Sequence, residues 1–396
     1  MRSAAFCRVV LGALILVGIS ISRAASDPSA ESTNAEKSPA IRLPPLRPGA
    51  TGAATSAPPA ANAPGAPRVS LRQGKVDYVS ATDLAVWLGL KGSWTEPLRK
   101  LALTDKLDPK NQLELEANRR SASVHGLRVE LGDPTLLRSG QLYVSRTDAE
   151  RGLAPLVRPA AVAGLPARPK IIALDAGHGG EDPGMENKKL GLKEKVLALD
   201  VTLRLEKLLK AAGYTVVLTR RDDRQLAPTK AADWQQRALI ANAARADLLV
   251  SLHFNSLYPD TRVSGTEVYV FTRAGQRSDQ SWGFAQADDS ERDASPVNQH
   301  DAWSSLLAHE LHRATVAGLN TTDRGQKTKH LAVLRGLNCP AVLIESLFLS
   351  NEAEARRAAT PEFRQRIAEV LATGIRGYAA TLEAARAKSA PAAAAK

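Results

Sequence analysis

The segment from residue 169 to about 384 alternates short apolar runs with longer segments whose apolar residues recur at helical spacing. The apolar runs predict strands at 170–174, 215–218, 248–252, 266–271 and 341–344. The longer segments predict helices at 195–212, 235–246, 303–319 and 361–382. Parallel strands need long crossover connections, which are usually helical. The alternation therefore predicts an α/β domain with a mostly parallel sheet and helices on both faces.

A different pattern precedes this domain, between residues 68 and 160. Short strand-like runs occur at 69–71, 75–79, 112–115, 121–124, 127–131 and 141–144. Ser80 is placed to cap a helix, with Asp83 as its partner three residues later. This segment is expected to form a small α+β module. It contains no cluster of catalytic residue types, which favours a spacer or a binding module.

The remaining segments are expected to lie outside any folded core. Residues 1–24 resemble a signal peptide, because Arg2 and Arg8 precede an apolar run at 9–21 and small residues follow. An uncleaved anchor is the alternative. Residues 25–67 are rich in Ala and Pro and predict a disordered linker, and 385–396 predict a disordered tail. No later stretch is long and apolar enough for a stable membrane span.

The formal net charge of +12 indicates which kinds of molecule this chain is expected to bind. In an exported protein, which would work in the periplasm or the extracellular cell envelope, a basic surface favours anionic envelope polymers or membrane surfaces. Nucleic acid is not expected, because no recognition motif is present and export argues against it. Cys339 lies at the start of an apolar run and is interpreted as a small buried residue, not as a nucleophile.

A polar insertion at 274–301 interrupts the strand–helix alternation. A surface loop is the simplest interpretation. The alternative is a lid or a regulatory segment on which a protein activator would act.

Several polar residues fall where the predicted strands end. His178 follows the strand at 170–174, His253 follows 248–252, and Glu345 follows 341–344. The carboxyl ends of parallel strands share one edge of a sheet, where such folds place their sites. Glu194 begins a helix on the same side. Two imidazoles and one carboxylate with an open position form a catalytic zinc site, and a second carboxylate can carry protons.

Each of these residues also has an ordinary structural interpretation. Glu345 would be a capping or salt-bridged carboxylate, Glu194 a solvated charge in a first helical turn, and His178 a histidine in a glycine-rich turn. The metal-site hypothesis depends on their occurrence together at one edge.

The other histidines are interpreted as structural. His309 and His312 stand three residues apart, whereas the helical zinc motif needs four, so they predict a solvated helix face. His125 and His300 are expected in loops. His330 is expected to precede a strand, where it could line a groove.

A set of motifs in the last 230 or so residues resembles one known family. The motifs are IIALDAGHGGEDPG, KEK, ADLLVSLHFNS, TDRGQ and LAVLRGLNCPAVLIESLFLSN, in that order. Together they resemble the catalytic domain of zinc-dependent N-acetylmuramoyl-L-alanine amidases over residues 169–384. The resemblance implies that His178, Glu194 and His253 bind Zn²⁺ and that Glu345 is catalytic. Ser346 and Leu347 depart from the usual small residue and glycine, which bears on the shape of the pocket.

The resemblance implies a peptidoglycan hydrolase that cleaves the amide between N-acetylmuramic acid and L-alanine of the stem peptide. Two alternatives remain open: another zinc peptidase acting on stem peptides, and an inactive wall-binding protein. The 68–160 module, with its DYVSATDLAVWLGL segment, loosely resembles the stalk-like domain of copper amine oxidases.

Overall fold

The computed structural model describes residues 65–278 and 293–389. All of these residues belong to one compact unit, Ser56–Lys396. The predicted signal peptide and nearly all of the predicted linker lie outside the described residues, as do the centre of the 274–301 insertion and the end of the chain.

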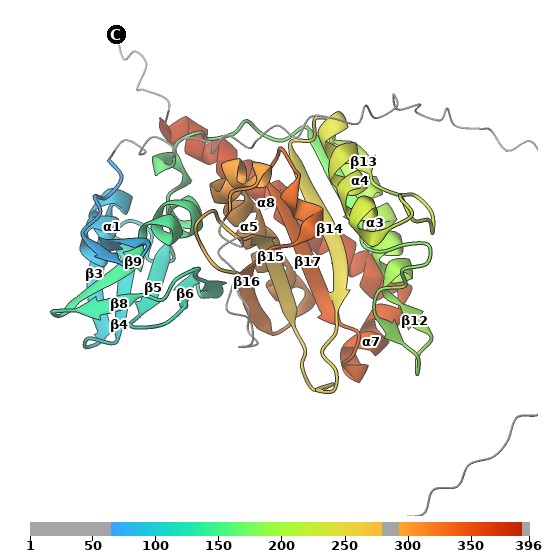
Figure 1. Ribbon diagram of the computed structural model, residues 1–396, viewed down its shortest axis with the longest axis horizontal. Coiled ribbons are helices and arrows are strands. Elements are labelled where there is room, and N and C mark those ends of the chain that lie inside the picture. Colours follow the sequence, from blue (N-terminus) through green and yellow to red (C-terminus); the bar gives the residue numbers. More distant parts are fainter. Residues whose placement is uncertain (1–64, 279–292, 390–396) are drawn as a thin grey trace, which may run out of the picture. The chain divides into compact units, whose positions relative to one another are not determined.

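The second half of the chain forms a mostly parallel sheet, as predicted (Figure 1). Its strands are β10 (Ile171–Ala176), β13 (Thr215–Leu218), β14 (Leu248–Asn255), β15 (Thr266–Phe271), β16 (Asp323–Lys329) and β17 (Ala341–Phe348). They lie in the order β13-β10-β14-β17-β15-β16. Neighbours are parallel except β15 and β17, which are antiparallel. The carboxyl ends of β10, β14 and β17 therefore lie at the same edge.

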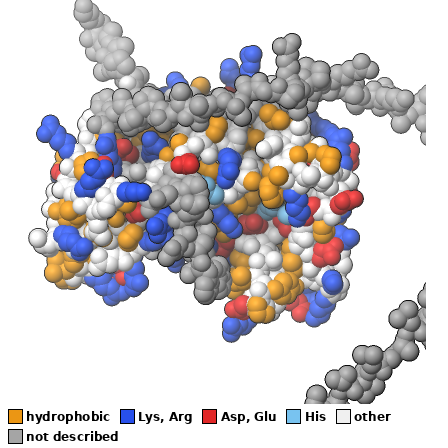
Figure 2. Space-filling view, in the orientation of Figure 1, with side chains coloured by type: hydrophobic (Ala, Val, Ile, Leu, Met, Phe, Trp, Pro, Cys, Tyr) orange, Lys and Arg blue, Asp and Glu red, His pale blue; other side chains and the backbone are white. Residues whose placement is uncertain are grey.

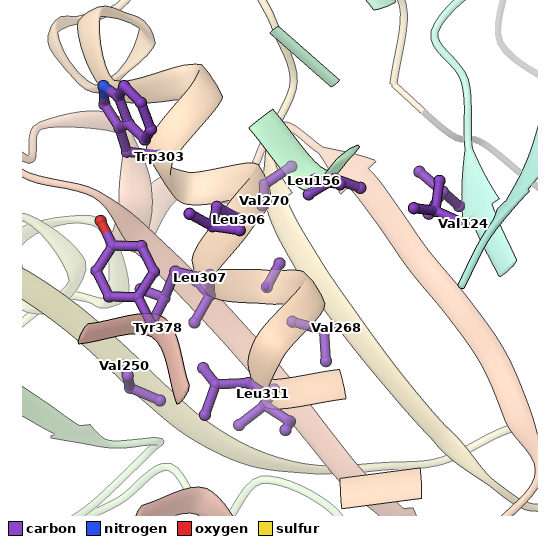
Figure 3. Packing of buried hydrophobic residues seen from close by; sticks show 14 of the residues in the cluster. Val124, Leu156, Val250, Val268, Val270, Trp303, Leu306, Leu307, Leu311 and Tyr378 are labelled. Atoms are coloured by element: carbon purple, nitrogen blue, oxygen red, sulfur yellow. The ribbon is translucent and has the colours of Figure 1, made fainter. Parts of the chain in front are cut away.

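Helices cover both faces of this sheet. They are α3 (Glu194–Ala211), α4 (Lys230–Ala243), α5 (Asp301–Leu319), α6 (Ala332–Arg335), α7 (Glu352–Ala359) and α8 (Pro361–Ser389). Ile172 and Leu174 of β10 share a buried cluster with α3, α5 and α8, whereas Ala173 packs with α4 and α6. Alternate residues of a strand point to opposite faces, so the two clusters are two layers of core. Figure 3 shows the packing of α5 against the strands.

Two strands run further than their apolar patterns predict. β14 continues through His253 to Asn255, with a register shift between these two residues, and β17 continues through Glu345 to Phe348. Backbone pairing with neighbouring strands keeps these polar residues in strand conformation. The hydropathy of the sequence does not show such pairing. Glu345 consequently lies inside a strand, paired in register with His253 of β14 and Glu267 of β15, rather than after the strand end.

The first half of the described chain forms the predicted α+β module. Its elements include β1 (Leu71–Gln73), β2 (Val76–Ser80), α1 (Ala81–Leu88), β3 (Leu90–Glu96), β4 (Lys100–Asp105), β5 (Gln112–Glu116), β6 (Ser121–Val124), β7 (Leu127–Glu130), β8 (Leu136–Arg138) and β9 (Gln141–Ser145). Ser80 caps α1 as predicted, accepting a hydrogen bond from the backbone N–H of Asp83 at 3.0 Å. The helical segments Asp148–Leu153 and α2 (Ala154–Val157) follow.

The α+β module is joined to the main sheet. β7 pairs with β16 through Gln326 and Val129, so strands β7 to β3 extend the sheet to eleven strands. A buried ion pair also crosses this boundary: the Arg273 guanidinium lies 3.2 Å from the Asp148 carboxylate, and both side chains are almost completely buried. The two parts therefore share backbone pairing and a buried charge pair.

The chain end differs from the prediction. α8 continues to Ser389, beyond the predicted boundary at residue 384. Its last turns are tied down, because the Arg386 side chain donates hydrogen bonds to the carbonyls of Leu165 and Pro166.

Across residues 65–278 and 293–389, no helix combines the length and the apolar character needed to cross a bilayer.

Candidate metal centre

The turn after β10 presents His178 at the carboxyl edge of the sheet. His178 has a left-handed backbone, with φ of 59°, which is uncommon for a residue with a side chain. Gly177 precedes it, and a Cβ at that position would lie 2.4 Å from the His253 ring. Only glycine therefore allows the backbone of this turn to approach His253 so closely.

Glu194 opens α3 and is buried, with 4% of its surface exposed. Its Oε2 accepts a hydrogen bond from the backbone N–H of Met185 at 2.8 Å, and its Oε1 accepts one from the backbone N–H of Phe254 at 3.0 Å. A Cβ on Gly184 would lie 2.5 Å from the carboxylate, so this neighbour must also be glycine. The surrounding backbone holds the carboxylate in one orientation.

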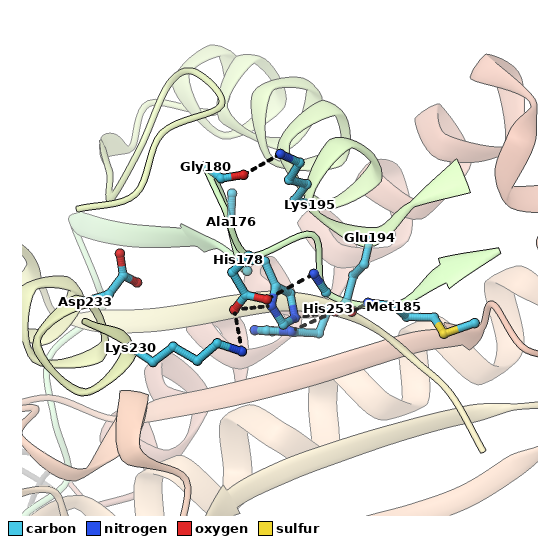
Figure 4. A network of polar contacts seen from close by, with 12 residues as sticks. Ala176, His178, Gly180, Met185, Glu194, Lys195, Lys230, Asp233 and His253 are labelled. Carbon is cyan, nitrogen blue, oxygen red and sulfur yellow. Dashed lines mark hydrogen bonds and ion pairs between the residues drawn. The ribbon is translucent and has the colours of Figure 1, made fainter. Parts of the chain in front are cut away.

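Both histidines point at the Glu194 carboxylate (Figure 4). His178 Nε2 lies 3.1 Å from Glu194 Oε1, and His253 Nδ1 lies 2.9 Å from the same oxygen. One ligand atom from each residue lies within 4.8 Å of the others. The three residues predicted as metal ligands are thus brought together from the turn after β10, from α3 and from β14.

The chemistry of the donor set fits a metal ion. Asp182 Oδ2 lies 3.0 Å from His178 Nδ1. With a metal ion bound, this carboxylate would hold the imidazole proton on Nδ1 and free Nε2 to act as a ligand. Burial by itself raises the pKa of Glu194, but hydrogen bonds from His178 and His253 outweigh burial and hold that pKa far below its ordinary value. A deprotonated carboxylate beside two imidazoles is a donor set that zinc accepts.

Glu345 faces the same region from β17. Its Oε2 is buried and has no hydrogen-bond partner among the described residues. Burial raises the pKa of Glu345 well above its ordinary value, and the nearby Glu194 and Glu267 carboxylates raise it further. A buried carboxyl group without a partner costs free energy, so its presence at this edge points to a chemical role.

These residues line a cavity of ≈ 840 Å³. Its lining includes the four residues above together with Met185, Lys230, Trp234, Arg237, Asn255, His330 and Val333. Figure 2 shows histidine side chains reaching the surface beside hydrophobic and basic side chains. The volume is in the range of protein cavities that bind organic ligands, and it exceeds what a small ion alone needs.

The α5 histidines were predicted wrongly. His309 and His312 are buried, with exposures of 2% and 1%, and do not form a solvated face. His309 Nε2 lies 3.0 Å from Nδ1 of His125 in the α+β module, and His312 Nε2 lies 2.7 Å from Asp323. α5 packs against both halves of the molecule, so this face is covered by a contact that local sequence does not reveal.

His330 follows β16 and precedes the short helix α6, rather than a strand. It lines the cavity, in agreement with the prediction that it could line a groove. Cys339 is buried, as predicted, with 3% exposure.

Sequence reasoning missed the residues that support the ligands. Asp182 lies four residues after His178 and could have been found from that spacing. Lys230, which lies 3.4 Å from Asp182, and Arg237 are both on α4, and no local pattern connects either with the metal site.

Comparison with known proteins identifies the family. The family model Amidase_3, described as N-acetylmuramoyl-L-alanine amidase, matches residues 172–377, which is more than half of the chain. This chain belongs to that family. The matched range contains His178, Glu194, His253 and Glu345.

The chain is also similar to individual proteins. An uncharacterised Bacillus subtilis protein, YqiI, is 33% identical over 57% of this chain and 93% of its own length. The germination-specific N-acetylmuramoyl-L-alanine amidase of Bacillus subtilis is 31% identical over 54% of this chain and 81% of its own length. An N-acetylmuramoyl-L-alanine amidase structure from Clostridium difficile 630 is 28% identical, with a TM-score of 0.43, over 54% of this chain and 97% of that one. As a family member, the chain is an amidase and a hydrolase of the cell wall.

Proposed function

We propose that this amidase cleaves the bond between the lactyl carbonyl of N-acetylmuramic acid and L-alanine, with Zn²⁺ held by His178, Glu194 and His253. The observation that carries the proposal is the meeting of three metal-ligand side chains beside a buried, unpartnered carboxyl group in one cavity. Bound there, zinc would lower the pKa of a water molecule and polarise the substrate carbonyl.

Glu345 is the proposed proton carrier. With the positive charge of zinc beside it, the Glu345 carboxyl would be ionised. Its unpartnered Oε2 would then take a proton from the attacking water and deliver it to the amide nitrogen as the C–N bond breaks. Its position on β17, paired in register with His253, keeps it beside the ligand set but outside it. Glu345 therefore has a different role from Glu194, whose two carboxylate oxygens accept hydrogen bonds from backbone N–H groups.

The cavity wall would bind the rest of the substrate. Trp234 lines the cavity with 40% of its surface exposed, an unusual exposure for a residue of this size. Lys230 lines the same wall from the first turn of α4. An apolar ring and a cation on one side suit a sugar ring and the carboxylates of a stem peptide. Leu347, one of the unusual residues after Glu345, is fully buried and is not part of the wall.

Product analysis tests the reaction. Purified protein would be incubated with intact peptidoglycan, with and without a chelator, and the products measured by mass spectrometry. We expect stem peptides with a new N-terminal L-alanine, and none of them in the presence of chelator. Release of single amino acids would show a carboxypeptidase instead. Binding to sacculi with no release of peptides would show an inactive wall-binding protein.

The site of action is proposed to be outside the cytoplasm. The charged start and apolar run at residues 1–24 support export to the periplasm or the extracellular envelope, where peptidoglycan lies. A protein activator acting on the 274–301 insertion remains a prediction, because residues 279–292 lie outside the described part of the chain.

A further inference from the structure

Two arginines lie buried directly behind the His178 turn. Arg220 has 1% of its surface exposed and Arg237 has 3%. Buried arginines are costly, because a guanidinium must leave water and have nearly all of its N–H groups bonded again. Neither residue has a role in the proton transfer described above.

The two guanidinium groups bind three consecutive backbone carbonyls. Arg220 donates to the carbonyls of Ala176 and Gly177, at 2.9 and 2.8 Å. Arg237 donates to the carbonyls of Ala176 and His178, both at 2.8 Å. The carbonyl of the proposed metal ligand and those of the two residues before it thus all accept hydrogen bonds from these two arginines.

Arg237 is itself fixed by two carboxylates. Its Nε donates to Asp233 at 2.7 Å, and its Nη1 donates to Asp175 at 2.9 Å. Asp175 also accepts hydrogen bonds from the hydroxyls of Thr219 and Ser251, at 2.7 and 2.6 Å. Burial raises the pKa of Asp175, but the Arg237 guanidinium and these hydroxyls outweigh it, so the carboxylate stays ionised.

The turn needs this support. A left-handed backbone at a residue other than glycine is strained and persists only where the surroundings enforce it. His178 adopts that conformation, with φ of 59°, and its orientation decides where Nε2 lies relative to Glu194. The hydrogen bonds to the Gly177 and His178 carbonyls hold the two peptide groups on either side of the His178 Cα, and so restrict the backbone rotation that would move the ring.

We propose that Arg237 and Arg220 are positioning residues that clamp the Ala176–His178 carbonyls and thereby hold His178 in the metal-binding orientation. The inference rests on the proposed metal site. These buried charges are Asp175 of β10, Asp233 and Arg237 of α4, and Arg220. In this proposal they contribute to metal affinity as well as to folding stability.

The test uses Arg237→Lys in the full-length protein. Lysine keeps the positive charge beside Asp175, but its single ammonium group cannot reproduce the planar fork that reaches Ala176 and His178 together. The matched control is Arg273→Lys. Arg273 is equally buried and is also paired with a buried aspartate, Asp148, but lies at the boundary with the α+β module.

Zinc affinity is measured by competition with a chromogenic chelator, and ligand geometry by the visible absorption of the Co²⁺-substituted protein. We expect Arg237→Lys to weaken zinc binding by about 10–100-fold and to change the cobalt spectrum, as loss of ligand-supporting groups does elsewhere. Arg273→Lys is expected to lower the melting temperature and leave both readouts unchanged.

Other results would overturn the clamp. Zinc affinity within about twofold of the unsubstituted protein, with the same cobalt spectrum, contradicts it. So does an unchanged affinity with a raised KM, which would make Arg237 a substrate-binding residue. Equal loss of affinity in Arg273→Lys would show a general effect of stability. Failure of the unsubstituted protein to bind zinc would instead reject the metal site itself.

Two milder variants cover the case in which Arg237→Lys does not fold. Arg220→Lys tests the same carbonyls from the other guanidinium. Thr219→Val removes only one hydrogen bond from Asp175 and leaves both arginines in place. We expect a weakening of zinc binding in each, smaller for Thr219→Val, and unchanged affinity in both folded variants contradicts the proposal.

Discussion

At the scale of single residues, the proposed chemistry depends on two carboxylates with opposite environments. Glu194 is surrounded by hydrogen-bond donors, which hold its pKa low, whereas Glu345 is buried without a partner and has a raised pKa. Such a pair separates the roles of ligand and proton carrier. The sequence predicted these residue types at this edge, but not the residues around them. Asp182 was missed although it lies only four residues after His178, whereas the two buried arginines reach the turn through tertiary contacts.

Glu345→Gln tests the proton-carrier role. Glutamine has nearly the same shape but cannot accept and return a proton, so we expect hydrolysis to fall by about 10²–10⁴-fold. Zinc content should stay unchanged, because Glu345 is outside the ligand set. Both are measured on one preparation, by metal analysis and by release of stem peptides. Retention of activity in the zinc-loaded variant would reject the role.

Cys339 is expected to be chemically inert in the folded protein. Its thiol is buried, and burial raises its pKa to about 12, so almost none of it is thiolate at pH 8. A chromogenic disulfide reagent should react with it only after denaturation. Rapid reaction in native buffer, in protein that lacks Cys7, would contradict this prediction.

At the scale of elements, apolar patterns located β10, β13, β14, β15 and β17 of the main sheet but not all of their bounds. β16 escaped prediction because Asp323–Lys329 is polar throughout and becomes a strand only through pairing with β15 and β7. β3 was missed because most of its residues are exposed. The continuation of β17 through Glu345 was also missed, although it sets the position of the proposed proton carrier. The burial of His309 and His312 on α5 was missed for a similar reason, because the residues that cover this face of the helix come from distant parts of the chain.

The start of α5 carries a pH-dependent contribution to stability. Burial raises the pKa of Asp301 to about 6, although Asn298 and Arg151 act in the opposite direction. Because the folded state binds this proton more tightly than the unfolded state, the contribution is full below about pH 4 and is lost as pH rises through about 6. Asp301→Asn removes it.

We therefore expect the free energy of unfolding of Asp301→Asn, relative to the unsubstituted protein, to rise by up to about 3 kcal/mol between pH 4 and pH 8. Urea unfolding at both pH values measures the difference. Parallel stability curves for the two proteins across this range would contradict the prediction.

At the scale of the whole described unit, the α+β module and the amidase domain are built as one body. The β7–β16 pairing, the His125–His309 contact and the Arg273–Asp148 pair all cross the boundary. The sequence predicted two separate folded segments, since nothing in a local pattern reveals pairing between them. The loose resemblance of the module to a stalk-like domain stays a prediction.

Because the α+β module and the amidase domain share strand pairing and a buried ion pair, we expect them to unfold together. In differential scanning calorimetry we expect one transition for both parts. Arg273→Met should lower the stability of the whole by about 3–5 kcal/mol, because it removes the ion-pair partner of the buried Asp148 side chain. Two resolved transitions, or a loss confined to the α+β module, would show that the parts fold independently.

The most direct test of the central claim compares zinc content and bond cleavage in the unsubstituted protein and in His253→Ala. We expect one zinc per chain and new N-terminal L-alanine on stem peptides for the unsubstituted protein, with both lost in the variant. Release of these stem peptides by metal-free protein, or full zinc occupancy in His253→Ala, would contradict the claim.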